Sequence, residues 1–200
     1  MEWLANKLTS CLLRHDVIDE AEQELYCFGF QSGLEMVACH LAILAVAAYL
    51  HRIPEYLLFS LVFVPIRSYA GGLHLPKFSQ CFICSCAVVA VVIFLSEKLE
   101  LSSPISAAAT AVMLFILFLL RPVDHENRPV DEDEQHFFSY KLRRAILGIG
   151  ILTAVLYLTG LNHYLVLVML TLASAIISMF VGKWLQYRRR GIRAQIAEDD

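Results

Sequence analysis

Hydrophobic residues in this chain fall into long runs separated by short polar stretches. A helix needs about 17–25 apolar residues to cross a bilayer, so the pattern predicts an all-α, polytopic membrane protein with about six transmembrane helices. The six runs are Gly33–Leu50, Pro54–Ile66, Phe78–Leu95, Pro104–Leu120, Ala145–Leu161 and Tyr164–Leu185. The second run is short for an upright span, and Pro54 and Pro65 each disfavour helix just before them. It therefore tilts, extends up to Tyr69, or enters the bilayer and returns.

The first 30 residues show an amphipathic pattern instead. Apolar residues recur there at helical spacing, with charged residues between them, as in Trp3, Leu4 and Leu8 around Lys7. That pattern suits a helix lying on a membrane surface, and equally a helix packed on the rest of the protein. We divide the chain into an amphipathic N-terminal segment (1–32), a membrane domain (33–187) and a cytoplasmic, basic-then-acidic tail (188–200).

Composition agrees with a membrane protein. Hydrophobic residues make up 58% of the chain and charged residues 18%, and the mean hydropathy is +0.61, whereas soluble domains have about 45–50% apolar and about 25% charged residues. The net charge of −3 gives no reason to expect a nucleic-acid partner. None of the 6 cysteines lies in a stretch that we place outside the cell, so we expect free thiols rather than disulfides.

Lysine and arginine positions predict the orientation, because these residues gather on the inner side of the membrane. With six spans and the N-terminus inside, all of them except Arg52 and Lys98 fall on the inner side. If the second run is re-entrant and the N-terminus is outside, Arg52 moves inside while Lys7 and Arg14 move outside. The charges leave both arrangements open, and both place the segment from 67 to 81 in the cytosol.

That segment, RSYAGGLHLPKFSQC, is polar and prone to bend between two apolar runs. His74 can exchange a proton near neutral pH, Cys81 attacks once it is a thiolate, and Arg67 suits a carboxylate or an oxyanion. Gly71 and Gly72 let the backbone turn sharply and expose its N–H groups. These are the parts of a cysteine hydrolase or acyl-transferase. A loop histidine and a packing cysteine explain the same residues without any chemistry.

Among the neighbouring cysteines, Cys81 is the best candidate nucleophile. Pro76 fits the first turn of a helix, which places Cys81 near the helix N-terminus, where the helix dipole stabilises a thiolate. Cys84 and Cys86 lie deeper in the hydrocarbon, which disfavours the charged form.

The sequence gives little support for a metal or redox centre. Cys81 and Cys84 form a C-x-x-C pair, but no second pair accompanies it, and a buried cysteine is often only a small hydrophobic residue. The acidic run 131–134 belongs to a polar loop, 121–135, and fits a solvated surface better than a metal site, because adjacent carboxylates do not converge on an ion. We expect neither a metal nor a cofactor.

The spacing R-x-x-x-G-G-x-H, followed seven residues later by Cys, resembles the bacterial accessory gene regulator protein B family. The matching positions are Arg67, Gly71, Gly72, His74 and Cys81. The Pro-rich segment RPVDHENRP, the six apolar runs and the leading amphipathic segment are also similar to this family. The resemblance therefore spans nearly the whole chain.

The resemblance implies a membrane cysteine endopeptidase. Such an enzyme cleaves the C-terminal tail from a small propeptide and cyclises the remainder, through an acyl-enzyme thioester, into a quorum-sensing autoinducing peptide. His74 and Cys81 carry over as the catalytic pair, with Arg67, Gly71 and Gly72 as supporting or oxyanion residues. The implied location is the bacterial cell membrane, with the active site on the cytoplasmic side.

The expected partners are the propeptide and the lipid bilayer, and flat apolar helix faces are compatible with a homodimer. The alternative function is a non-enzymatic small membrane transporter or assembly factor. It predicts that Cys81→Ser and His74→Ala leave function intact. The lack of paired charges inside the predicted spans counts against it.

Overall fold

The computed structural model describes residues 2–70, 78–120 and 132–199. Over these residues the chain contains helices and no strand, which confirms the all-α prediction. The elements are α1 (Glu2–Arg14), the 3₁₀ turn η1 (Glu20–Glu22), α2 (Gln23–Tyr49), α3 (Ile53–Ala70), α4 (Phe78–Lys98), α5 (Ser103–Leu119), α6 (Glu132–Leu158) and α7 (Asn162–Asp199). The chain divides into two units, Met1–Ile53 with Lys77–Ser85, and Pro54–Pro76 with Cys86–Asp200.

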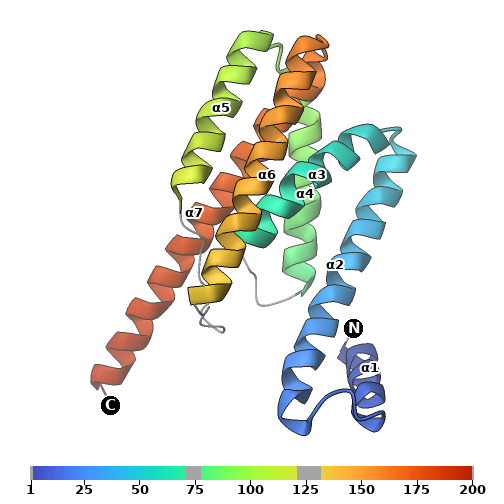
Figure 1. The fold of residues 1–200 in the computed structure, drawn as a ribbon, viewed down its shortest axis with the longest axis vertical. Helices are drawn as coiled ribbons and strands as arrows, with labels where there is room; N and C mark the ends of the chain where they lie inside the picture. Colours follow the sequence, from blue (N-terminus) through green and yellow to red (C-terminus); the bar gives the residue numbers. More distant parts are fainter. Residues whose placement is uncertain (1, 71–77, 121–131, 200) are drawn as a thin grey trace. The chain divides into compact units, whose positions relative to one another are not determined.

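A helical hairpin forms most of the first unit, in which α1 folds back beside the N-terminal half of α2 (Figure 1). Ala5 and Thr9, one helical turn apart, are both buried on α1. The thiol of Cys27 on α2 donates to Oδ1 of Asn6 at 2.9 Å. The face of α1 that includes Ala5 and Thr9 is therefore packed on the protein.

The N-terminal segment contains a reversal of the chain. α1 ends at Arg14, and Asp16 takes a left-handed conformation (φ 53°) that reverses the chain. Aspartate tolerates this conformation better than most residues. Asp19 and Glu22 then form a capping box that starts the next helical segment. Residues 23–32 consequently belong to the same helix as the first apolar run.

α1 also keeps an exposed amphipathic surface. Trp3 is 73% exposed, and Leu4 and Leu8 are each 38% exposed. Nζ of Lys7 lies 5.2 Å from the centre of the Trp3 ring, a distance at which a cation–π interaction is favourable. One side of α1 is thus packed, while contact of the exposed side with a membrane surface stays a prediction.

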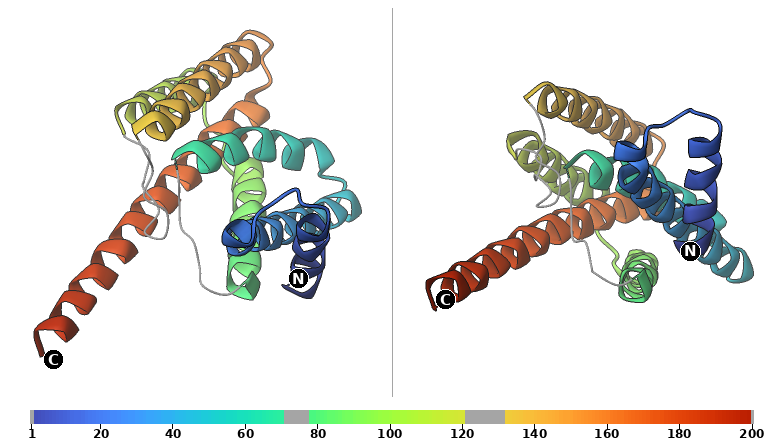
Figure 2. Two further views of the ribbon diagram at one scale, coloured as in Figure 1. Left: turned by 60° about the horizontal axis from the view of Figure 1, so that its bottom comes forward. Right: turned by 90° about the horizontal axis from the view of Figure 1, so that it is seen from below.

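The second unit is built around α7, which packs against α5 and α6 (Figure 2). Thirteen mutually packed buried residues form its core, drawn from α3, α5, α6 and α7: Val62, Ile66, Ala70, Leu114, Leu117, Leu142, Ile149, Leu156, Leu165, Val168, Leu172, Ala175 and Met179. Their recurrence at intervals of three, four or seven residues is the pattern of one helix face. α7 supplies five of these residues, more than any other helix.

Several hydroxyls in these apolar helices bond within their own helix. Thr110, Thr153 and Thr171 each donate to the carbonyl oxygen four residues earlier, at 2.7–2.8 Å. This arrangement satisfies a buried polar group where water is excluded.

Pro65 does not end α3, which agrees with the alternative that the second apolar run extends up to Tyr69. The helix continues through it to Ala70, which adds the residues that the second apolar run lacks on its own. A proline inside a helix removes one backbone hydrogen bond, but helices in apolar surroundings tolerate this when neighbouring groups compensate. With 18 residues, α3 is about 27 Å long.

Two other helices extend beyond their apolar runs. Residues 132–135, which we expected in a polar loop, already belong to α6. Hydropathy does not register this part of the helix, because the stretch is polar. α7 runs without a break to Asp199, and Figure 1 shows it continuing past the ends of α5 and α6.

Three helices in the described ranges are long and apolar enough to cross a membrane. They cover Glu20–Tyr49, Ser79–Lys98 and Asn162–Leu185, and Ser103–Leu119 is a shorter apolar helix. The protein is therefore an all-α membrane protein. The number of spans, about six, stays a prediction.

Candidate functional site

Cys81 lies at the start of an apolar helix. α4 begins at Phe78, so Cys81 is its fourth residue, and its side chain is half-buried. The expectation that this cysteine sits near a helix N-terminus is confirmed. The first backbone N–H groups of a helix have no partner within the helix, and together they favour negative charge. This position suits a thiolate better than those of Cys84 and Cys86, which lie further along α4.

Three of the predicted site residues, Gly71, Gly72 and His74, lie outside the described residues, as does Pro76. Their roles stay predictions from the sequence. The two helices that flank them are described separately, because α3 from Pro54 belongs to the second unit and the start of α4 to the first.

Arg67 lies in the last turn of α3, four residues before Gly71. Its guanidinium donates from Nη1 to Oγ of Ser178 on α7 at 3.0 Å, and both side chains are half-buried. Ile66 and Ala70, on either side of Arg67 in the chain, are fully buried in the core. The hydrogen bond thus links the end of α3 to α7. The sequence predicted Arg67 as a functional residue but gave no signal for Ser178.

Basic residues in the second unit pair with aromatic rings. Arg143 on α6 lies 5.5 Å from the ring centre of Phe118 on α5, and Arg188 lies 4.8 Å from that of Trp184. Such pairs are favourable, and aromatic and basic residues both concentrate at membrane–water interfaces. Their positions in α5, α6 and α7 are those expected where helices leave the hydrocarbon.

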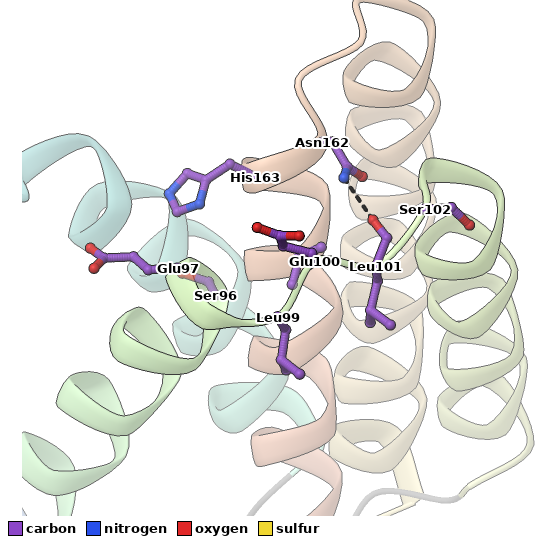
Figure 3. A pocket seen from close by; sticks show the side chains of 9 residues that line it. Ser96, Glu97, Leu99, Glu100, Leu101, Ser102, Asn162 and His163 are labelled. Atoms are coloured by element: carbon purple, nitrogen blue, oxygen red, sulfur yellow. Dashed lines mark hydrogen bonds between the residues drawn. The ribbon is translucent and has the colours of Figure 1, made fainter.

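The second unit also contains a polar cluster that sequence reasoning missed, and Figure 3 shows two of its members, Asn162 and His163. Nε2 of His163 lies 3.5 Å from Oε1 of Glu55, which is only 6% exposed. Nδ2 of Asn162 donates to the carbonyl oxygen of Leu101 at 2.7 Å, and Ser103 donates to Oδ1 of Asn162 at 3.1 Å. These bonds tie the α4–α5 connection to the start of α7.

An open depression of about 460 Å³ lies beside this cluster and is lined by residues of α4, the α4–α5 connection and α7. The sequence gives no signal for the contact between His163 and Glu55, because the two residues are distant in the sequence. In the part of the chain that the structure describes, no three His, Cys, Asp or Glu side chains are grouped to hold a metal ion.

The fold and the site together define a class: an all-helical membrane protein with a cysteine in the first turn of an apolar helix, just after a Gly-Gly-x-His segment. The family model of accessory gene regulator B matches residues 4–182, and the chain belongs to this family. This membership gives the protein a role in the accessory gene regulator system of quorum sensing. Comparisons with curated proteins and with solved structures find no match.

Proposed function

We propose that this protein is a membrane cysteine endopeptidase that cleaves a small propeptide and cyclises it into a quorum-sensing autoinducing peptide. Membership of the accessory gene regulator B family carries the proposal. The position of Cys81 in the first turn of α4 supports it, because a nucleophilic cysteine needs a setting that favours its thiolate. The placement of Arg67 at the end of α3, beside the Gly-Gly segment, also supports it.

The first step forms an acyl-enzyme. His74 takes the proton from Sγ of Cys81, and the thiolate attacks the scissile carbonyl carbon of the propeptide. Backbone N–H groups near Gly71 and Gly72, together with Arg67, stabilise the oxyanion. When the peptide C–N bond breaks, His74 returns the proton to the leaving amine. The C-terminal tail departs as a free peptide, and the rest stays bound to Cys81 as a thioester.

The second step closes the ring. A cysteine or serine within the propeptide attacks the thioester carbonyl, and Cys81 leaves and recovers its proton. Forming a thioester from a peptide bond is uphill, whereas exchange of one thioester for another is nearly balanced. An internal nucleophile has a high effective concentration, and a site at the edge of the hydrocarbon contains little water. Both effects favour cyclisation over hydrolysis.

The reaction takes place on the cytoplasmic side of the bacterial cell membrane, where the positive-inside distribution puts the segment from 67 to 81. The propeptide arrives along the inner leaflet as an amphipathic helix, and the N-terminal segment 1–32 meets it there. The membrane domain, 33–187, contains the site, and the tail 188–200 is cytoplasmic. Two copies of the chain associate as a homodimer.

The test is co-expression with the propeptide encoded beside the gene, followed by mass spectrometry. We expect the wild type to release the tail fragment and the cyclic peptide. Cys81→Ala and His74→Ala should release neither product. Cys84→Ala is the matched control, because it makes the same change one turn further along α4 and should leave both products in place.

A propeptide whose internal nucleophile is replaced by alanine extends the test, because it can acylate the enzyme but cannot cyclise. We expect a mass increase on the wild type that hydroxylamine removes and that is absent from Cys81→Ala. Tail release by Cys81→Ala, or an adduct that maps to Cys84, contradicts the proposal.

A further inference from the structure

The hydrogen bond between Arg67 and Ser178 joins two residues that are 111 positions apart in the sequence. Ser178 lies on α7 between two buried core residues, Ala175 and Met179. Arg67 lies on α3 between two fully buried ones, Ile66 and Ala70. The two helix segments that present this pair are therefore fixed by packing, and the bond has a defined geometry.

Ser178 has a partner on another helix, and the other serine one turn away on α7 has one within α7. Ser174 donates to the carbonyl oxygen of Thr171 at 2.7 Å, within its own helix. Ser178 accepts a hydrogen bond from a charged group on a different helix. Hydrogen bonds to charged groups are stronger than those between neutral groups, and they are stronger still where the surroundings are apolar.

We propose that Ser178 is a positioning residue for the reaction, acting through Arg67. This inference rests on the proposed function. A guanidinium is planar and presents its donors in a fixed fork, so a hydrogen bond at one nitrogen restricts the orientation of the whole group. The oxyanion appears only as the thiolate attacks, and donors that are already oriented stabilise it without reorganisation. Loss of the Ser178 hydroxyl therefore slows the chemical step rather than weakening propeptide binding.

The experiment measures tail release from a synthetic propeptide by the full-length protein in liposomes, with kcat and KM determined separately. We expect Ser178→Ala to lower kcat about tenfold or more, as for loss of a hydrogen bond to a charged group, with KM changed less than about twofold. Ser178→Thr, which keeps a hydroxyl, should restore most of the rate. Ser174→Ala is the matched control and should match the wild type.

A double-variant cycle tests whether Ser178 acts through Arg67. An Arg67→Lys variant lacks the planar set of guanidinium donors. In this background Ser178→Ala should therefore lower kcat much less than it does in the wild type. Rates are normalised to the amount of protein with a reactive Cys81, measured by alkylation of this thiol. The unfolding midpoint of each variant is compared with that of the wild type. An equal loss in both backgrounds, or a loss explained by less folded protein, overturns the inference.

Failure of the inference and failure of the proposed function give different results. If the wild type releases no tail, the proposed function fails. If the wild type releases the tail in a Cys81-dependent reaction while Ser178→Ala behaves like Ser174→Ala, only the positioning role fails.

Discussion

Two isoleucines on α6 allow a direct test of how the second unit packs. Ile149 is 5% exposed and belongs to the core, whereas Ile151, two residues later, is 59% exposed. The two positions share residue type, helix and depth along α6. Replacing each with alanine removes the same atoms and changes helix propensity equally, so any difference in stability reports packing alone.

The expected magnitude follows from what surrounds the side chain. Ile→Ala in a water-excluded core costs about 2–5 kcal/mol. About 2.4 kcal/mol of that is transfer from water, at about 0.8 kcal/mol for each of three carbon groups. In a bilayer the transfer free energy does not contribute to the cost, because lipid is as apolar as the core. We therefore expect Ile149→Ala to cost up to about 2.5 kcal/mol, and more than Ile151→Ala, which should cost less than about 0.5 kcal/mol.

The assay is reversible unfolding in mixed micelles by added SDS, followed by circular dichroism, with free energies compared at a common SDS fraction. A cost for Ile151→Ala that equals or exceeds that for Ile149→Ala refutes the assignment of the α6 face. It would mean that residues around Ile151, not those around Ile149, contact α5 and α7.

Further predictions use the same preparation. Gly160 has φ 72° and Gly148 does not lie in that region, so Gly160→Ala should destabilise the protein by about 1 kcal/mol. Gly148→Ala, in open space within α6, should stabilise it by up to about 1 kcal/mol. Stabilisation by Gly160→Ala together with destabilisation by Gly148→Ala would contradict the turn geometry. Ala5 is fully buried on α1, so Ala5→Leu should detach α1 from α2 and raise amide hydrogen exchange throughout α1, and unchanged exchange would count against their packing. In a Trp184→Phe variant, brominated lipids should quench the fluorescence of Trp3, and absence of quenching would argue against an interfacial α1.

The position of Cys81 was predictable because it depends on local signals. A polar segment with glycines, a proline and then an unbroken apolar run predict a helix start, and α4 covers Phe78–Lys98. The helical class followed in the same way from the six apolar runs. Signals of this kind lie within one turn or one span of the residue that they concern.

Helix ends were less predictable, since hydropathy marks only the apolar part of a helix. α6 starts well before Ala145, the first residue of its apolar run, and α7 continues beyond Leu185 to Asp199. These extensions are rich in Glu, Gln, Lys, Arg and Ala, which are good helix formers but leave no mark in a search for spans. Pro65 shows a different limit, because the steric bias against helix before a proline is only a tendency, and α3 continues through Pro65.

The contact between Arg67 and Ser178 shows what lies beyond local signals altogether. A serine in an apolar helix looks the same in the sequence whether or not a charged group of another helix lies within hydrogen-bond distance of it. Only the tertiary structure brings Arg67 to Ser178, and it depends on residues such as Ile66 and Met179 in the shared core. A catalytic motif can thus be recognised from its own few residues, while the groups that orient it come from whichever helix the core places beside it. In this family, variation in those supporting residues should change the rate of the reaction without changing the motif.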